Sequence, residues 1–259
     1  MNSEISRLEF AKSLALEAGK LAQDMRTKAS NGFIKSKGLQ DFVTEADREV
    51  ERLIKSRIAA QYPDDAFLGE EGGSQGDSTS LWVVDPIDGT ANYMRSLPDW
   101  AVSIAYCENN IIQIGVICAP DMGNLAWAKL GDGAYVDDKP IHVSDCADPA
   151  MALIMLGRSS RRSVKSYLGV VAAIFDANME YRRNGAATIG LLAVALGRAE
   201  SYYEAHVNAW DALAGILLVN EAGGTCNHDG ITAFLECGSK ILVGNGHIDA
   251  RMQAIIDLS

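Results

Sequence analysis

Residues 82–90 form the segment of this sequence whose side chains and spacing are best suited to chemistry. An apolar run is followed by Asp85 and Asp88, three positions apart, and then directly by Gly89 and Thr90. A buried strand that ends in carboxylates places them at its carboxyl end, where open α/β sheets bind ligands. Two carboxylates held close together repel one another, and hard oxygen ligands favour Mg²⁺. The segment therefore predicts a magnesium site.

The residues between and after the two aspartates help to arrange them. Pro86 restricts Asp85 to an extended conformation, so that the two carboxylates splay around a common point. The main-chain carbonyl of Ile87 lies between them and can serve as a third oxygen ligand. Gly89 lets a phosphate approach the backbone, and Thr90 supplies a hydroxyl that could orient a water. An Asp-x-x-Asp pair alone is also typical of a strand-ending turn with solvated acids.

Three further acidic segments lie elsewhere in the chain. Glu70 and Glu71 follow a short apolar segment, and taken alone they are more typical of loop charges than of ligands. Asp211 opens a strongly apolar helical segment, where it would act as the N-cap, a role compatible with metal ligation. Thr44 and Asp47 have the spacing of a capping box before a helix.

Together these four segments resemble those of the inositol monophosphatase family of Mg²⁺-dependent, lithium-sensitive phosphatases. The motif Asp-Pro-Ile-Asp-Gly-Thr followed by Asn92, and Trp-Asp with Glu-Ala-Gly-Gly ten residues later, are specific to this superfamily. The resemblance covers roughly residues 5–250. It implies a layered α-β-α-β-α sandwich of the inositol monophosphatase and fructose-1,6-bisphosphatase type, with the site between two halves, and a homodimer.

The resemblance implies a role for each residue that matches a family motif. The implied metal ligands are Glu70, Asp85, Asp88, Asp211 and the carbonyl of Ile87. The attacking water would be activated by Glu70 and Thr90, with Asp47 supporting Thr90. The backbone amides of Gly89 and Thr90 would hold the phosphate.

The resemblance also implies contacts to the rest of the substrate. Glu204 would hydrogen-bond substrate hydroxyls, with Ala187 at a contact position and Asp211 beside them. A mobile loop that relatives place near a further metal site matches residues 34–40, including Lys35.

The reaction that these residues predict is direct in-line hydrolysis of a phosphate monoester. Phosphatases that form a phospho-aspartate carry Asp-x-Asp-Gly-Thr, whereas here two residues separate the aspartates, which argues against that covalent route. Glu204 favours a neutral polyol, so the expected substrate is inositol 1-phosphate. Histidinol phosphate and fructose 1,6-bisphosphate are alternatives. Some bacterial relatives bind the transcription apparatus, which leaves a regulatory binding role open.

The composition is that of a globular enzyme expected in the cytoplasm. The chain has 259 residues, 48% of them hydrophobic, so it can bury a large core. Its net charge of −11 argues against nucleic-acid binding, because phosphate backbones demand clustered Lys and Arg. Neither a signal peptide nor an apolar stretch of about 20 residues is apparent, which argues against membrane insertion. Five widely spaced cysteines indicate reduced core thiols, and a Cys226–Cys237 pair is disfavoured.

Neither the basic side chains nor the histidines indicate a second functional site. Arg158, Arg161, Arg162 and Lys165 form a local cluster that is more typical of a solvated helix face than of a phosphate-binding patch. The four histidines are scattered, with no spacing typical of a zinc site.

The hydrophobic periodicity predicts an α/β architecture. Helices are expected over 5–25, 44–62, 163–177 and 186–196, then from 209 and after 243, and strands over 82–85, 100–107, 111–119, 125–130, 133–136, 152–156, 179–183, 199–204 and 240–243. The Gly/Ser-rich segment 72–80 is expected to be a mobile loop. Residues 1–145 are predicted to form an N-terminal half with most of the metal ligands. Residues 146–259 would form a C-terminal half that completes the site in one compact unit.

Overall fold

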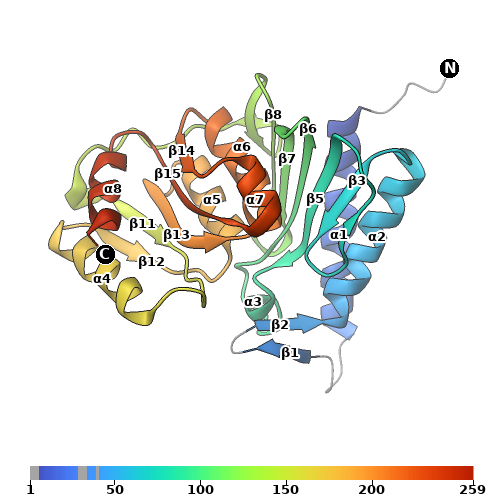
Figure 1. Cartoon of the computed structure of the whole chain (residues 1–259), viewed down its shortest axis with the longest axis horizontal. Coiled ribbons are helices and arrows are strands. Elements are labelled where there is room, and N and C mark those ends of the chain that lie inside the picture. Colours follow the sequence, from blue (N-terminus) through green and yellow to red (C-terminus); the bar gives the residue numbers. More distant parts are fainter. Residues whose placement is uncertain (1–5, 29–33, 39–40, 259) are drawn as a thin grey trace.

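A computed structural model describes residues 6–28, 34–38 and 41–258, and in these ranges the elements form five layers (Figure 1). Helices α1 (Arg7–Lys28) and α2 (Glu45–Gln61) cover the outer face of an eight-stranded sheet. Helices α5 (Ala187–Ala195) and α6 (Ala209–Glu221) lie between this sheet and a five-stranded one. Helices α4 (Val164–Asp176) and α8 (Asp249–Asp257) cover the far side. The predicted α-β-α-β-α sandwich is confirmed.

The eight-stranded sheet is almost entirely antiparallel and has the order β10-β9-β8-β7-β6-β5-β3-β4. Its strands are β3 (Ala66–Gly69), β4 (Gly73–Gln75), β5 (Ser80–Asp88), β6 (Ala101–Glu108), β7 (Ile111–Ala119), β8 (Asn124–Lys129), β9 (Gly133–Val136) and β10 (Lys139–Pro140). The exception is the parallel pair of β3 and β5. Asn109 and Asn110 adopt φ of 52° and 60° between β6 and β7, which suits a tight hairpin turn.

The five-stranded sheet is mixed and has the order β12-β11-β13-β15-β14. Its strands are β11 (Leu153–Leu156), β12 (Glu180–Arg182), β13 (Ser201–Val207), β14 (Thr225–His228) and β15 (Ser239–Gly244). Strand β11 runs parallel to both β12 and β13, so the carboxyl ends of these three strands meet at one edge. The remaining elements are short: the pair β1 (Ile34–Gly38) and β2 (Asp41–Thr44), and the helices α3 (Thr90–Tyr93), α7 (Ile231–Cys237), η1 (Pro120–Met122) and η2 (Pro149–Met151).

The strand predicted over 82–85 is longer than expected and runs to Asp88. Its pairing with β6 shifts register between Asp85 and Asp88, at the position of Pro86. Such irregularities re-aim side chains at the end of a strand, and they accommodate a proline that cannot donate to the ladder. The segment 72–80 is not simply a loop, because β4 lies within it and pairs with β3.

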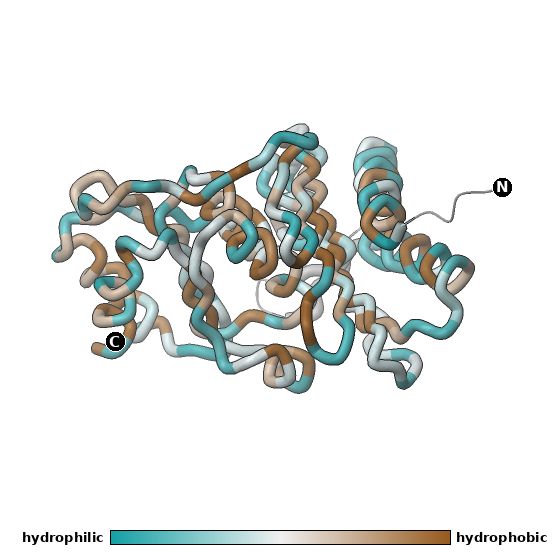
Figure 2. The backbone as a smooth tube through the Cα atoms, turned by 90° about the horizontal axis from the view of Figure 1, so that it is seen from above, coloured by the Kyte–Doolittle hydropathy of each residue, from teal (hydrophilic) through white to brown (hydrophobic). Residues whose placement is uncertain are grey.

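The helices and the two sheets bury their apolar sides in three clusters. The largest contains most of α5 and α6, which are apolar around most of their circumference because a sheet lies on either side. The outer helices alternate between hydrophilic and hydrophobic residues, as the tube in Figure 2 shows, because only one of their faces is covered. The cysteines, all within the described ranges, are free thiols, but Cys237 is exposed, so the expectation of core thiols was wrong there.

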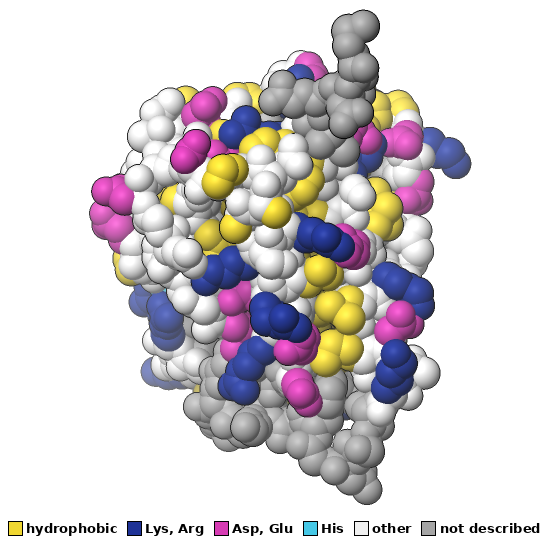
Figure 3. Space-filling view, turned by 90° about the vertical axis from the view of Figure 1, so that its right-hand side faces the viewer, with side chains coloured by type: hydrophobic (Ala, Val, Ile, Leu, Met, Phe, Trp, Pro, Cys, Tyr) yellow, Lys and Arg dark blue, Asp and Glu magenta, His cyan; other side chains and the backbone are white. Residues whose placement is uncertain are grey.

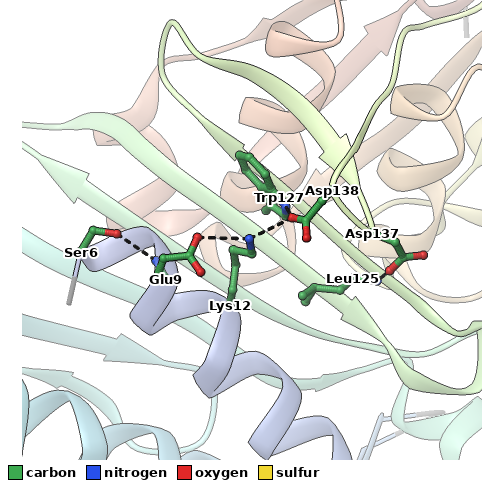
Figure 4. Close-up of polar contacts among 7 residues, drawn as sticks. All are labelled: Ser6, Glu9, Lys12, Leu125, Trp127, Asp137 and Asp138. Carbon is green, nitrogen blue, oxygen red and sulfur yellow. Dashed lines mark hydrogen bonds and ion pairs between the residues drawn. The ribbon is translucent and has the colours of Figure 1, made fainter.

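Polar contacts hold the first helix on the eight-stranded sheet (Figure 4). Lys12 Nζ of α1 donates to Glu9 Oε1 over 3.1 Å and to Asp138 Oδ1 over 3.0 Å. Asp138 lies in the turn after β9. Trp127 Nε1 of β8 donates to the same Asp138 oxygen over 3.1 Å, and the Lys12 ammonium lies 4.6 Å from the Trp127 ring centroid. These contacts tie the amino-terminal end of α1 to strands more than one hundred residues away in the chain.

The face seen in Figure 3 carries basic and acidic side chains interspersed with hydrophobic ones. A surface of this kind lacks the single-sign charge that a nucleic-acid backbone requires. None of the helices in the described ranges combines the length and the apolar character needed to cross a bilayer.

The two-half organisation remains our proposal, with its boundary at residues 145/146 between β10 and β11. Asn92 lies on the N-terminal side of this boundary, and its Nδ2 donates to the Asn184 carbonyl over 2.7 Å on the other side. Asn184 Nδ2 in turn donates to Asp99 Oδ1 over 2.8 Å. The halves are therefore joined by direct hydrogen bonds next to the strand end that carries the aspartates.

Replacing Gly115 by alanine should destabilise the fold. Gly115 lies on β7 where α6 crosses the sheet, and an added Cβ would come within 2.6 Å of the Ala214 carbonyl oxygen. Overpacking of this kind costs about 1–3 kcal/mol. Chemical denaturation measures the change, and Gly169→Ala on the exposed side of α4 is the control, expected to be neutral or stabilising. An unchanged midpoint for Gly115→Ala would show that the helix is not tightly packed on the sheet.

Candidate active site

Three carboxylates converge where the eight-stranded sheet meets the central helices. Asp85 and Asp88 come from the end of β5, and Asp211 comes from the first turn of α6. Each offers one oxygen, and these oxygens all lie within 4.8 Å of one another. Ser103 of β6, which pairs in register with Asp85, donates its hydroxyl to the Trp210 carbonyl over 2.9 Å. This bond fixes the start of α6 beside the strand end.

Asp85 has one oxygen that is satisfied and one that is not. Its Oδ1 accepts the backbone N–H of Ile87 over 2.9 Å, within the irregular end of the strand. Its Oδ2 is buried, and in the ionised form no N–H or O–H group among the described residues donates to it, whereas a protonated Asp85 shares its proton with the Asp211 carboxylate. An unpartnered buried carboxylate oxygen is costly, so this atom is suited to a cation.

Asp88 is held by the first turn of α5. Its Oδ2 accepts the Thr188 backbone N–H over 2.7 Å and the Thr188 hydroxyl over 2.6 Å. These bonds join residues one hundred positions apart and hold the Asp88 carboxylate at the start of α5. Thr188 was not singled out from the sequence, and a buried threonine one residue into an apolar helix gives no signal of this role.

Asp211 occupies a different helix position from the one predicted. The N-cap of α6 is Asn208, and Asp211 is the third helical residue of a capping box. Its Oδ2 accepts the Asn208 backbone N–H over 3.0 Å and the Asn208 side-chain amide over 3.1 Å. The extended conformation of Asn208 (φ −86°, ψ 169°) is the one an N-cap adopts. Asp211 is therefore oriented by the residue that caps its own helix.

Burial and mutual repulsion make the three carboxylates harder to ionise than ordinary aspartates. Burial raises the pKa of Asp85 well above its usual range, and the charges of Glu70, Asp211 and Asp88 raise it further. Burial and Asp211 raise the pKa of Asp88 to about 7, and burial raises the pKa of Asp211. A cluster of all-oxygen donors with raised pKa values and an unpartnered oxygen fits a hard divalent cation, which would favour the ionised forms.

Glu70 lines the same cavity from the turn between β3 and β4. That turn is held by Glu51, a buried acid on α2 whose Oε2 accepts the Glu71 backbone N–H over 2.8 Å. A Cβ at Gly69 would lie 2.3 Å from Glu51 Oε2, so the glycine is required for the close approach. Sequence reasoning missed Glu51, although an acid among the inward-facing positions of an amphipathic helix was a signal.

Thr90 and Asp47 come together across two elements. The Thr90 hydroxyl lies 3.1 Å from Asp47 Oδ1 and 3.1 Å from the Ile87 carbonyl oxygen. Asp47 is buried in the first turn of α2, which begins at Glu45. Gly89 has φ of 85°, and a Cβ there would lie 2.7 Å from the Asp99 carbonyl oxygen. Only glycine therefore lets the chain turn from the strand into Thr90.

A cavity of about 360 Å³ opens beside the carboxylates. The cavity is lined by residues that the sequence singled out, namely Glu70, Asp88, Asp211, Ala187 and Glu204. Burial raises the pKa of Glu204 to about 8, and the buried Tyr202 donates its hydroxyl to Glu204 Oε2. A Cβ at Gly157 would lie 2.0 Å from the same Glu204 oxygen, so this glycine leaves the room that the acid occupies.

Two sequence predictions concern parts of the chain beyond this cluster. The backbone of 34–38 is strand β1, paired with β2, whereas residues 39–40 and the side chain of Lys35 lie outside the described residues. The basic cluster is not a helix face at Arg158 and Arg161, because α4 begins only at Val164. Both arginines line the cavity instead, together with Arg183 and His206.

Comparison with known proteins agrees with this geometry. The family model described as "Inositol monophosphatase family" matches residues 4–255. The chain belongs to the inositol monophosphatase family. It is a phosphatase of a metal-dependent family that acts on small phosphorylated substrates.

Individual relatives resemble the chain over most of its length. The Nus factor SuhB of Xylella fastidiosa is 36% identical over 222 residues, which cover 85% of this chain and 81% of that protein. The inositol-1-monophosphatase of Rhizobium meliloti is 35% identical over 248 residues, 93% of this chain and 92% of that protein. The solved structure of Thermotoga maritima IMPase matches with a TM-score of 0.88 at 28% identity and covers 98% of this chain and 97% of its own.

The metal-free protein should become less stable as the pH rises. Asp85, Asp88 and Asp211 keep protons in the folded state at pH values where aspartates of the unfolded chain, with a pKa of about 3.9, have ionised. The folded state therefore binds more protons between about pH 4 and 7, and its free energy of unfolding falls across this window. Thermal unfolding in EDTA at several pH values measures this fall.

Adding Mg²⁺ at neutral pH should reverse the loss, because a bound cation favours the ionised carboxylates. Asp85→Asn should weaken both the pH effect and the Mg²⁺ effect, whereas Asp64→Asn, at an exposed position, should leave both unchanged. Equal responses of the two variants would contradict a cation site at Asp85.

Tyr202→Phe should weaken substrate binding more than it slows turnover. The variant removes the hydroxyl that orients Glu204 and leaves the ring packing intact. Loss of one such bond is worth about 1 kcal/mol, so we expect KM for inositol 1-phosphate to rise about fivefold with kcat nearly unchanged. Tyr203→Phe is the matched control, because adjacent strand residues point to opposite faces of the sheet. Equal effects of the two variants would argue against a positioning role for Tyr202.

Proposed function

We propose that this chain hydrolyses phosphate monoesters of polyols with Mg²⁺, with inositol 1-phosphate as its expected substrate. The observation that supports this most is the buried Asp85 oxygen without a hydrogen-bond donor, inside a three-carboxylate cluster that borders the cavity. The alternative for Asp85 and Asp88, solvated charges in a strand-ending turn, does not agree with the burial of both side chains.

The residues proposed to hold the metal are Glu70, Asp85, Asp88, Asp211 and the carbonyl of Ile87. Their donors are all oxygens, which suits Mg²⁺ better than softer metals. When bound, the cation supplies positive charge that stabilises the transferring phosphate. The same positive charge lets an acidic pocket accept an anionic substrate.

The chain's own residues would position the attacking water and the phosphate. Asp47 orients the Thr90 hydroxyl, which would hold the water, and Glu70 would accept a proton from it. The backbone amides of Gly89 and Thr90 would bind the phosphate oxygens. A bond forms between the water oxygen and phosphorus, the bond from phosphorus to the polyol oxygen breaks, and that oxygen takes up a proton.

Glu204 and Ala187 would contact the polyol. An oriented carboxyl group hydrogen-bonds vicinal hydroxyls well, and the small Ala187 leaves space for a ring. Histidinol phosphate and fructose 1,6-bisphosphate remain the alternative substrates on the same scaffold.

Further parts of the proposal rest on family membership. We propose inhibition by lithium, assembly as a homodimer and a location in the cytoplasm. One relative is named a Nus factor, so a regulatory role in binding the transcription apparatus is the second candidate function. The complete set of acidic side chains favours catalysis, because a protein that only binds would not need them.

Phosphate release from inositol 1-phosphate, histidinol phosphate and fructose 1,6-bisphosphate, with Mg²⁺ and with EDTA, tests the proposal. Inositol 1-phosphate should be hydrolysed with Mg²⁺ only. Thr90→Val should lower kcat by about 100-fold, in the range for loss of one water-positioning group, while Mg²⁺ still stabilises the protein. Asp64→Asn should behave as the unaltered protein. Release from none of the three substrates would refute the catalytic proposal and favour the binding role.

A further inference from the structure

Helix α2 carries two buried acids on one face. Asp47 is 1% exposed and Glu51 is 5% exposed. They are four residues apart, so they lie one helical turn from each other on the same side of the helix. Acids are almost never fully buried without partners, and like charges at this spacing destabilise a helix. The stability of α2 itself therefore does not explain the pair.

Glu51 holds the turn between β3 and β4 with both of its carboxylate oxygens. Its Oε2 accepts the Glu71 backbone N–H over 2.8 Å, and the Gly72 N–H also hydrogen-bonds to the carboxylate. A Cβ at Gly72 would lie 2.6 Å from Glu51 Oε1, just as one at Gly69 would lie 2.3 Å from Oε2. The contacts lie on both sides of Glu70, so Glu51 fixes the segment that presents this residue.

Strand β5 fixes the same segment from the opposite direction. The Glu70 backbone N–H donates to the Val84 carbonyl over 3.3 Å, and Gly69 pairs with Val84 in the parallel register of β3 and β5. Val84 directly precedes Asp85, a proposed metal ligand. Glu70 is thus held between the strand that carries the aspartates and the helix that carries Glu51.

The same face of α2 also reaches Thr90, whose hydroxyl lies 3.1 Å from Asp47 Oδ1. Thr90 and Glu70 are the two residues proposed to handle the attacking water, and they come from separate segments, after β5 and after β3. Asp47 and Glu51 are about 6 Å apart along the helix axis. One rigid helix can therefore fix the two segments relative to each other.

We propose that Glu51 is a positioning residue for the reaction, whose carboxylate holds Glu70 in place relative to Thr90 so that both contact one water. The inference rests on the proposed function and assigns a role to a residue that lies outside the cavity lining. Glu51 acts through Glu70 and contacts no substrate atom itself.

Replacing Glu51 by methionine removes both acceptors at nearly constant volume. A group displaced by about 1 Å can cost about 100-fold in rate, so Glu51→Met should lower kcat for inositol 1-phosphate by about that factor. KM should change by about twofold at most, because no substrate contact is lost. Glu51→Gln keeps one oxygen acceptor and should retain kcat within about tenfold of the unaltered protein.

The matched control is Glu49→Met. Glu49 is a partly exposed acid on the same helix that pairs with Arg52, so its loss should leave kcat and KM unchanged. Full activity of Glu51→Met, or the same loss in Glu49→Met, would overturn the inference.

A double-mutant cycle separates positioning from a general loss of stability. In a Glu70→Gln background the placement of residue 70 no longer matters for proton transfer, so Glu51→Met should lower kcat by a further threefold or so at most, about threefold rather than 100-fold. The same 100-fold loss in both backgrounds would show that Glu51 acts on the fold as a whole, and the inference would be wrong.

Gly72→Ala perturbs the same contact from the turn if Glu51→Met does not fold. Gly72 is exposed, so the fold should tolerate the added Cβ, but Glu51 Oε1 must move away from it. We expect kcat to fall by about fivefold in the unaltered protein and to stay constant in the Glu70→Gln background. An unchanged kcat for Gly72→Ala in the otherwise unaltered protein would overturn the inference.

Mg²⁺ binding provides a readout that does not depend on turnover. Because Glu70 is a proposed metal ligand, calorimetric titration with Mg²⁺ alone should show about tenfold weaker binding to Glu51→Met, and no further weakening when Glu70→Gln is already present. If the unaltered protein releases phosphate from no substrate, the proposed function fails, and this titration still tests the placement of Glu70. Equal Mg²⁺ affinities of Glu51→Met and the unaltered protein would overturn the inference.

Discussion

Mutual repulsion among Asp85, Asp88 and Asp211 is the constraint on which the site depends. Each carboxylate is held by a hydrogen bond, from the Ile87 amide to Asp85, from Thr188 to Asp88 and from Asn208 to Asp211, and one oxygen of each lies within 4.8 Å of the others. These bonds come from three separate elements, so the fold itself imposes the crowding. Burial then raises the pKa values, and the unfavourable arrangement is tolerated because a cation can relieve it.

The layered architecture is what makes such crowding sustainable. The central helices α5 and α6 lie between two sheets, so their first turns cannot move without disturbing packed surfaces on both sides. Gly115 lets the backbone of β7 contact α6, and Ser103 donates a hydrogen bond to the first turn of the same helix. Both contacts hold α6 in a fixed position on the sheet. The stability of the layers thus supplies the rigidity that the carboxylates need.

The cavity combines two opposite kinds of charge. Its carboxylates suit a cation, and its arginines suit an anion, although the chain as a whole carries a net charge of −11. Overall charge therefore says little about the ligand of a particular site, because the local arrangement of a few groups decides the potential there.

The sequence by itself determined the family, because its motifs need only neighbouring residues. Hydrophobic periodicity predicted the α/β class, and the family resemblance predicted the layered fold and the acidic residues that we propose for the site. It also placed most long helices and strands within a few residues. It missed the strands β1, β2, β3, β4, β10 and β14 and the helix α7, which are too short to show a clear periodicity. Only the tertiary structure decided which partners hold the site: Thr188, Glu51 and Arg183 act on residues that lie far from them in the chain. The N-cap of α6 also fell to Asn208 rather than Asp211, since the choice depends on where the chain leaves β13. Such contacts are set by the packing of distant elements, so local patterns such as the inward-facing acid Glu51 and the spacing of Asn208 and Asp211 signal a role without identifying the partner.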